Sequence, residues 1–446
     1  MDSRRKAIWG WTMYDWANSA FVTTVAAGFF PIFFKLYWNQ GVDPNTSTAR
    51  LALANSIASL AIALMAPILG AVADRGSNRK RFLVFFAYLG CVMTAGLFFV
   101  HEGNWQLACL LFVFGLFGFS GSNIFYDGLL PMVSRSDSVD RVSGLGYGMG
   151  YLGGGLLFLI NVIMYKYPEA FGLANGLEAV RYAFLTVALW WGGFTLITIA
   201  WVKEERAEAK TPFRVTVVEG ISQVFVTLQR IRHLKTAFLF LVAYWLYIDG
   251  VDSIIRMALD YGMALGFGTE DLLTALLLTQ FVGFPAAILY SRWGQWFGVR
   301  KAIMVGIGIY MMVTVWGVFI DSRAEFYGLA LVIGSTQGGI QALSRSYFTR
   351  LIPASQAAEF FGFYNMLGKF AAIVGPLMVG VVGLAVRWAM MPPSPSAEQL
   401  VEVGHMASRW GIGSLLLLFV AGGILLHFVD EERGRREAES FETKNV

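Results

Sequence analysis

The first apolar segment of the chain contains the sequence Tyr14-Asp15-Trp16-Ala17-Asn18-Ser19-Ala20-Phe21. The segment runs from about residue 8 to residue 38, which suffices for a membrane-spanning helix because a bilayer core takes roughly 20 helical residues. A carboxylate in such a helix is costly, by roughly 2.5–3.5 kcal/mol at the bilayer centre and by less near its surface. Asp15 and Asn18 are three residues apart and therefore share one helix face. The sequence thus predicts a membrane helix with a polar group within its apolar length.

Two interpretations of this polar group are open. In the first, Asp15 and Asn18 face a water-filled cavity inside a helical bundle, where they contact a substrate or an ion. In the second, Asp15 lies at the membrane surface, where water solvates it and the rings of Tyr14 and Trp16 form part of an aromatic belt. We favour the first interpretation, which makes Asp15 and Asn18 candidate binding residues.

The composition indicates a helical protein that crosses the membrane many times. Of the 446 residues, 56% are hydrophobic and only 14% are charged, whereas a soluble domain carries about 25% charged residues. The apolar runs are continuous and about twice as long as the strands of a membrane β-barrel, which alternate over roughly 10 residues, so the pattern argues against that class. We therefore expect an all-α multi-pass membrane protein.

Twelve apolar segments are long enough to span a membrane. They lie at about 8–38, 50–73, 82–101, 104–131, 142–165, 179–202, 235–262, 270–292, 300–320, 325–351, 359–387 and 406–429. We divide the chain into an N-terminal six-helix bundle at 1–202, a linker loop at 203–234, a C-terminal six-helix bundle at 235–429 and a tail at 430–446. The linker contains a candidate amphipathic helix at 215–231, and the charged tail is expected to be disordered.

The placement of lysine and arginine predicts the orientation of the chain. Of the 34 Lys and Arg residues, 25 fall on the N-terminus, the tail and the loops on the same side, and 7 fall on the opposite side. The remaining two, Arg256 and Lys369, fall within predicted spans. Because cytoplasmic segments carry the excess of Lys and Arg, we expect both termini and the linker in the cytoplasm, and the protein in the plasma (inner) membrane.

The two halves of the chain repeat several features in the same order. A basic turn follows the second span at residues 74–81 and the eighth span at residues 298–301. A proline closes the fourth span at Pro131 and the tenth at Pro353. Six spans followed by six in a parallel repeat is the layout of major facilitator transporters, whose halves are related by an axis along the membrane normal.

Two stretches carry a resemblance to a known family. The sequence Gly70-Ala71-Val72-Ala73-Asp74-Arg75, followed by Arg79-Lys80-Arg81, is similar to the signature loop of the major facilitator superfamily. The stretch at 14–21 resembles one branch, the autophagy-related vacuolar amino-acid effluxers of fungi and their prokaryotic relatives. The resemblance implies a major facilitator fold of twelve transmembrane helices in two six-helix bundles. It also implies secondary transport, by efflux, of amino acids or similar small metabolites.

The loop after the second span contains four candidate gating residues: Asp74, Arg75, Arg79 and Lys80. A carboxylate at this position pairs with cationic side chains or caps a neighbouring helix N-terminus. Such a contact latches the two halves in one state and breaks in the other. The alternative is a cytoplasmic loop with one solvated aspartate, in which the basic residues only set the orientation.

The fourth span carries Asn123, Tyr126 and Asp127 on one helix face. Resemblance to the superfamily implies that the first and fourth spans both line the central cavity. Asp15 and Asp127 are then expected at similar depth as a carboxylate pair, in which one member holds a proton. The alternative is that Asp127, close to Pro131, lies at the water boundary.

The seventh span is the most polar and contains Tyr247, Asp249, Asp252 and Arg256. The spacing places both acids and Arg256 along one helix face, so an Asp252–Arg256 pair leaves Asp249 free to titrate or to meet a cationic group of a substrate. The alternative is a purely structural ion pair.

Two further spans carry features of interest. Asn365 and Lys369 lie four residues apart on the eleventh span. Lys369 either binds a substrate carboxylate or a cavity acid, or extends its ammonium group toward the cytoplasm. Gly146, Gly150 and Gly154 form a ladder of small residues on the fifth span, and the resemblance implies that this span packs against the eighth.

We expect a secondary active transporter that moves a small polar metabolite, an amino acid or similar zwitterion, by alternating access with proton-coupled efflux. The alternatives are a facilitated-diffusion carrier and a non-transporting receptor or scaffold with the same fold. The expected partners are the substrate, protons and the lipid bilayer, with no nucleic acid, and we expect a monomer that is not an enzyme. The sequence has no His/Cys/Asp/Glu cluster with metal-ligand spacing and no Gly-x-x-x-x-Gly-Lys loop, so we expect no metal, no cofactor and no ATP-driven transport.

Overall fold

The structure, a computed structural model, describes residues 3–42, 50, 54, 57–58, 60–71, 78–135, 137–204, 234–264, 267–392 and 396–443. Within these ranges every regular element is a helix. The N-terminal half contains α1 (Ser3–Ala20), η1 (Phe21–Phe29), α2 (Phe30–Phe33), η2 (Phe34–Trp38), the helix Leu60–Ala71, α4 (Arg79–Gly96), η3 (Leu97–Phe99), α5 (Trp105–Val133), α6 (Val139–Lys166), η4 (Pro168–Phe171) and α7 (Gly176–Trp201). The C-terminal half contains α9 (Lys235–Ala264), α10 (Thr269–Phe297), α11 (Val299–Phe319), α12 (Arg323–Leu351), η5 (Ala354–Gln356), α13 (Ala357–Met390), α14 (Ala397–Ser414), α15 (Leu416–His427) and α16 (Glu431–Thr443).

These helices coincide with the predicted spans. In the described part of the chain, eight helices are long and apolar enough to cross a membrane, and Leu60–Ala71 and Val374–Met390 are shorter apolar segments. The first span continues through the wider turns of η1 and η2 as far as Trp38, and the last is divided at Leu415 into α14 and α15. The prediction of an all-α multi-pass membrane protein is confirmed.

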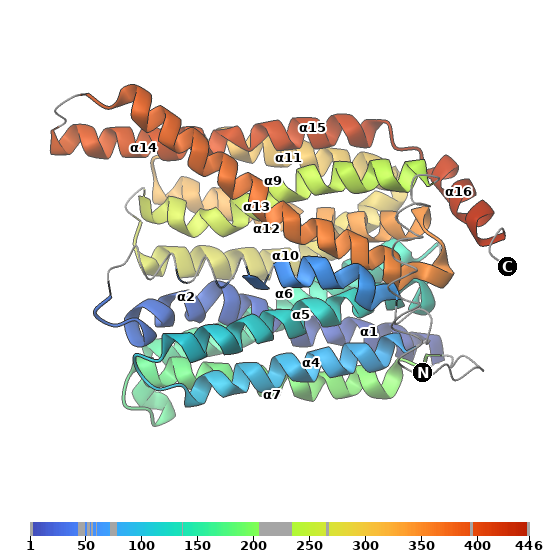
Figure 1. The fold of residues 1–446 in the computed structure, drawn as a ribbon, viewed down its shortest axis with the longest axis horizontal. Coiled ribbons are helices and arrows are strands. Elements are labelled where there is room, and N and C mark those ends of the chain that lie inside the picture. Colours follow the sequence, from blue (N-terminus) through green and yellow to red (C-terminus); the bar gives the residue numbers. More distant parts are fainter. Residues whose placement is uncertain are drawn as a thin grey trace.

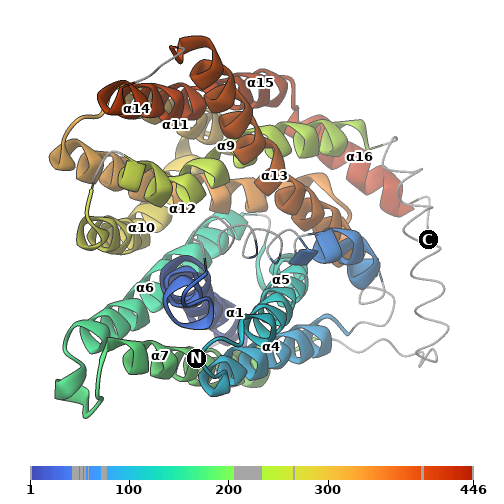
Figure 2. The same cartoon turned by 60° about the vertical axis from the view of Figure 1, so that its left-hand side comes forward.

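The helices run side by side in two groups, α1–α7 in one and α9–α15 in the other (Figures 1 and 2). Each group has its own cluster of buried apolar residues, which extends from Trp11 to Val202 in one and from Leu234 to Val429 in the other. Figure 1 places the start of α1 and the whole of α16 at the same end of the molecule. We call this end, where α1 begins at Ser3, the terminal face.

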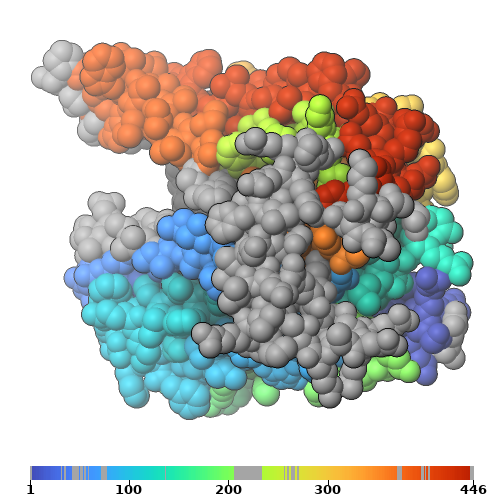
Figure 3. All heavy atoms as spheres, turned by 45° about the vertical axis from the view of Figure 1, so that its right-hand side comes forward, coloured from blue at the N-terminus to red at the C-terminus, as the bar shows by residue number. Residues whose placement is uncertain are grey.

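The two groups pack backbone to backbone near the terminal face. A Cβ atom at Gly70 would lie 2.2 Å from the carbonyl oxygen of Ala358 in α13, and one at Gly362 would lie 2.6 Å from the carbonyl oxygen of Ala66. Glycine permits this close crossing because it has no side chain. At the opposite end, the space-filling view shows a notch between α13 and the N-terminal half (Figure 3). The halves are therefore closed on each other at the terminal face.

The glycine ladder of α6 faces a different neighbour from the expected one. A Cβ atom at Gly146, Gly150 or Gly154 would come within 3 Å of side chains in α1 or η1. The face of α6 toward α10 carries Gly144 and Gly148 instead. The fifth span does pack against the eighth, as the resemblance implies, but through Gly144, Gly148 and Gly155, because α6 has small residues on two faces and the spacing alone does not distinguish them.

The tail forms a docked helix, so the expectation of disorder is wrong. In α16, Ala438 is buried and Phe441 lies against Phe360, with ring centroids 6.4 Å apart. The side chain of Glu437 accepts a hydrogen bond from the backbone N–H of Thr236 at 2.9 Å, at the first turn of α9. The charged composition was misleading because α16 buries one face against the C-terminal helices and exposes its charges on the other.

Candidate functional site

The site is organised around Arg345 of α12, which is only 3% exposed. Its Nη1 lies 3.1 Å from Oδ1 of Asp127 in α5 and 3.7 Å from Oδ2 of Asp15 in α1. Its Nε donates to Oγ of Ser143 in α6 at 2.9 Å, and its Nη2 donates to the carbonyl oxygen of Ser143 at 3.0 Å. One cation of the C-terminal half is thus bound by three helices of the N-terminal half.

Aromatic rings enclose the same guanidinium group. The Cζ atom of Arg345 lies 4.4 Å from the ring centroid of Tyr147, 4.9 Å from that of Trp11 and 5.3 Å from that of Tyr126. The faces of aromatic rings attract a cation, most strongly where water is excluded. The rings of Trp11 and Tyr126 are stacked with centroids 4.2 Å apart, and Trp11 donates to the backbone carbonyl of Tyr126 at 2.8 Å. The surroundings of Arg345 are therefore both charged and rigid.

Each carboxylate of the site has a second partner. The hydroxyl of Tyr126 donates to Oδ2 of Asp15 at 2.8 Å. Nδ2 of Asn365 in α13 donates to Oδ2 of Asp127 at 3.1 Å. The site thus contains two acids, one base and their hydrogen-bond donors, held by α1, α5, α6, α12 and α13. Buried charges are normally paired in this manner, because an isolated charge is very costly in an apolar environment.

The structure brings together four of the predicted site residues, namely Asp15, Tyr126, Asp127 and Asn365. Asp127 is only 7% exposed in this closed arrangement. Two others, Asn18 and Asn123, form a separate bridge between α1 and α5, in which Nδ2 of Asn18 donates to Oδ1 of Asn123 at 2.7 Å.

The predicted residues of the seventh span lie in α9, apart from this network. The Asp249 carboxylate accepts hydrogen bonds from the backbone N–H of Gly375, at 3.0 Å to each oxygen, and from Ser253 at 3.3 Å. The spacing of charges along the seventh span did not predict these hydrogen-bond donors, of which one is a backbone N–H of α13. The hydroxyl of Tyr247 shares a 2.6 Å hydrogen bond with that of Ser344, next to Arg345. Asp252 is partly buried.

The predicted gating residues separate into three groups. Arg79 connects the halves, because Nη1 donates to the carbonyl of Gly128 at 3.2 Å and Nη2 to that of Ser355 at 3.1 Å. Lys80 acts within the N-terminal half, where its Nζ donates to the carbonyls of Ile199 and Val202 at the end of α7. Asp74 and Arg75 lie outside the described residues, as does the 215–231 helix. The side chains of Arg256 and Lys369 also lie outside the described part.

Sequence reasoning missed Arg345. The charge count assigned it to a cytoplasmic segment, because it stands six residues before the end of α12. A second missed contact lies nearer the terminal face, where Arg350 forms ion pairs with Asp140 of α6 and with Glu431 of α16. The available signal was the position of Arg345 in a helix whose neighbouring positions, Ser344 and Ser346, are small and uncharged.

Comparison with solved structures identifies the fold class. The human organic anion transporter MFSD10 superposes with a TM-score of 0.68 at 13% identity, over 96% of this chain and 100% of that chain. The major facilitator transporter FucP, in an outward conformation, gives a TM-score of 0.67 at 13% identity, over 96% of this chain and 100% of that chain. The fold is that of the major facilitator superfamily.

Sequence comparison identifies the family within this class. The family model described as "Vacuole effluxer Atg22 like" matches residues 42–385. The "Uncharacterized MFS-type transporter YxiO" of Bacillus subtilis is 38% identical over 95% of this chain and 94% of its own length, and Autophagy-related protein 22 of Yarrowia lipolytica is 24% identical over 83% and 74%. The chain therefore belongs to the Atg22-like family of major facilitator transporters, which confirms the family that its sequence resembles.

Proposed function

We propose that the protein is a secondary active transporter that moves an amino acid or a similar small zwitterion by alternating access, with proton-coupled efflux. The observation that carries the proposal is the contact of Arg345, in the C-terminal half, with Asp15 and Asp127, in the N-terminal half. Membership of a family described as vacuole effluxers supports the direction of transport.

Alternating access requires this contact to break. When the halves separate at the terminal face, Arg345 leaves the two carboxylates, and each charge then needs water or a new partner in place of the old one. A proton on Asp127 or Asp15 removes one charge, and a substrate carboxylate gives Arg345 a new partner. A zwitterion pairs with both charges of the site, because its carboxylate binds Arg345 and its ammonium group binds the acid that remains ionised. Substrate and proton binding are thus linked to the opening of the terminal face.

The charge distribution supports a cytoplasmic location for the terminal face, so we infer that the structure is closed toward the cytoplasm. A second layer of contacts closes the same face through Arg79 with Ser355 and Arg350 with Asp140. We assign these contacts to the gate, together with Asp74 and Arg75 of the signature loop. Asn18, Asn123 and the acids of α9 remain candidate contacts for the substrate.

Transport by the purified protein in liposomes tests the proposal. Radiolabelled amino acids are supplied one at a time, with a pH gradient across the membrane in either direction, and accumulation above the external concentration is measured. The proposal predicts accumulation that a proton ionophore abolishes. Equilibration without accumulation would indicate a facilitated-diffusion carrier. Absence of flux for every zwitterion, in protein that is folded and inserted, would favour a receptor or scaffold.

A further inference from the structure

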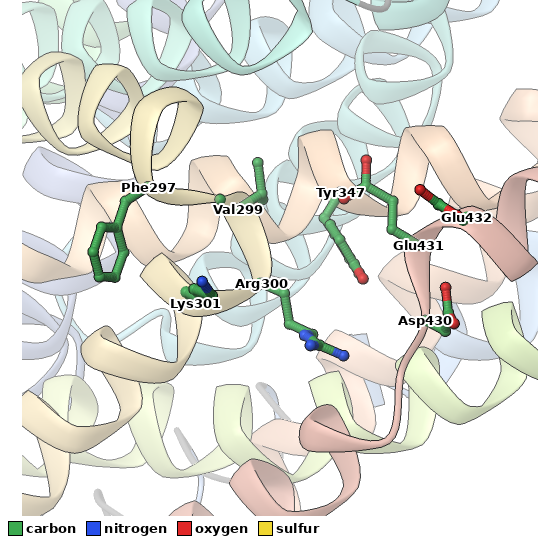
Figure 4. A pocket seen from close by; sticks show the side chains of 9 residues that line it. Phe297, Val299, Arg300, Lys301, Tyr347, Asp430, Glu431 and Glu432 are labelled. Carbon is green, nitrogen blue, oxygen red and sulfur yellow. The ribbon is translucent and has the colours of Figure 1, made fainter.

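A cavity of about 350 Å³ lies at the terminal face of the C-terminal half, away from the Arg345 site. The start of α11, the end of α12 and the start of α16 surround it (Figure 4). Its volume is at the lower end of the range of about 300–1,000 Å³ that is typical of small-molecule sites. The cavity is therefore large enough for a small metabolite or a lipid headgroup.

The two walls of the cavity carry opposite charges. Arg300 and Lys301, in the first turn of α11, line one side, and Asp430 and Glu432, at the start of α16, line the other (Figure 4). A helix N-terminus also attracts anions through its backbone N–H groups. The Nη1 of Arg300 donates to the carbonyl of Val429 at 2.7 Å, so the basic wall is connected to the backbone that carries the acidic wall.

The hydroxyl of Tyr347 lies between the two walls (Figure 4). The side chain is fully buried, and its hydroxyl has no hydrogen-bond partner within the described part of the chain. Buried tyrosine hydroxyls usually have a partner, because leaving one unpaired costs about 1–3 kcal/mol. An unpaired hydroxyl that points into a charged cavity indicates a position for a polar group of a ligand.

We propose that this cavity binds a small zwitterion. Its anionic group lies against Lys301 and the first turn of α11, with Tyr347 as hydrogen-bond donor, and its ammonium group lies against Asp430 and Glu432. Free amino acids and the ethanolamine headgroups of lipids share this chemistry. The site is distinct from the Arg345 site, and only its effect on the closed state rests on the proposed function.

The site is connected to the contact between the halves. Glu431 lies in the acidic wall, and its Oε1 is 2.8 Å from Nη1 of Arg350, whose other terminal nitrogen pairs with Asp140 of α6. A ligand that holds the start of α16 in place also holds Glu431 on Arg350. Occupancy of the cavity therefore favours the state that is closed at the terminal face.

Hydrogen–deuterium exchange of the full-length protein in detergent tests this proposal. Exchange of the α16 amides is followed with glycine or O-phosphoethanolamine, and with acetate and methylammonium as single-charge controls. A bound probe stabilises the docked state of α16 in proportion to the ratio of the free probe concentration to the dissociation constant. When the free concentration is about ten times the dissociation constant, exchange of the α16 amides is expected to slow about tenfold. The slowing is expected to be lost in Lys301→Gln and to weaken in Tyr347→Phe. It is expected to persist in Asp127→Asn and in the control Arg435→Gln.

Nanodiscs with and without phosphatidylethanolamine distinguish the two sources of the ligand. Slow exchange in the ethanolamine discs without any soluble probe would assign the site to a lipid headgroup, whereas slowing only by the soluble probes would assign it to a free metabolite. The proposal is overturned if neither source slows exchange of α16 in the wild type. Equal slowing in the wild type, Lys301→Gln and Tyr347→Phe would overturn it as well. Tyr347→Phe retains the packed ring, so it remains informative if Lys301→Gln fails to fold.

Discussion

Nη1 of Arg345 lies 3.1 Å from Oδ1 of Asp127, although 218 residues separate them in the sequence. The pair joins α12 to α5 and therefore one half of the transporter to the other. Both side chains are buried, so neither charge retains its hydration shell, and each depends on the other. This mutual dependence makes the pair a direct physical link between the charge state of the site and the relative position of the halves.

The first prediction concerns the stability of this pair. Arg345→Gln leaves Asp127 and Asp15 buried without their cation, and is expected to destabilise the closed state by about 3–5 kcal/mol. The double variant Arg345→Gln/Asp127→Asn removes one of the orphaned charges and is expected to lose less stability than the single variant. Thermal unfolding in detergent measures the coupling in a double-mutant cycle. Simple additivity of the two single substitutions would show that the residues do not interact.

The second prediction concerns the close crossing of α13 and the helix Leu60–Ala71. Gly362→Ala places a Cβ atom against the backbone at Ala66, and is expected to force the halves apart at the terminal face. Gly380→Ala in the same helix meets nothing within 4 Å and is the matched control. The control is expected to gain up to about 1 kcal/mol from helix propensity.

Spin labels report this opening. The labels are attached to Asp137→Cys and Ala354→Cys, which are exposed positions near the terminal face, one in each half. The natural Cys91 and Cys109 are replaced by serine so that they are not labelled. Double electron–electron resonance is expected to give a longer distance between the two labels in Gly362→Ala than in Gly380→Ala. The same distance distribution in both variants would mean that this crossing does not set the closed state.

The fold could be predicted from the sequence because the relevant signals are local. Apolar runs give the spans, and the stretch at 14–21 and the loop at 70–81 indicate the family. The acids Asp15 and Asp127 could be selected because a carboxylate in an apolar helix is costly in any arrangement.

The missing parts depend on tertiary contacts. In the sequence, the residues around Arg345 resemble those around a charge near the membrane surface. Arg345 is buried only because Ser143 and the two acids of the other half pack against it. One hydrogen-bond donor to Asp249 is a backbone N–H of α13, which a pattern of side chains in the sequence does not indicate. The docking of α16 likewise depends on contacts with α9, such as the one between Glu437 and Thr236.

The third prediction concerns topology. Glu102→Cys, exposed in the loop between η3 and α5, is expected to react with a membrane-impermeant maleimide added outside intact cells. Asp137→Cys, exposed in the loop between α5 and α6, is expected to react only after the membrane is permeabilised. The reverse pattern would place the terminal face outside and invert the proposed direction of opening.

The fourth prediction concerns the docked tail. A side chain at Gly434 would meet Leu351 and Thr236, since a Cβ atom there would lie 2.4 Å from Cδ2 of Leu351. Gly434→Leu is expected to detach α16, whereas Arg435→Gln on its exposed face is expected to leave it docked. Limited trypsin digestion measures the difference as faster cleavage after Arg433 in Gly434→Leu. Equal cleavage rates in the two variants would contradict the packing of α16.

Gradient-driven accumulation by Asp127→Asn shows whether the contact between Arg345 and Asp127 couples transport to protons. The amide keeps the size of the side chain and an oxygen that accepts a hydrogen bond, but it neither pairs with Arg345 as an anion nor exchanges a proton. In proteoliposomes the variant is expected to lose accumulation under a pH gradient and to retain exchange of labelled for unlabelled substrate, while the exposed control Asp137→Asn keeps both activities. Accumulation at the wild-type level in Asp127→Asn would contradict the account, because coupling would then not pass through the contact between Arg345 and Asp127.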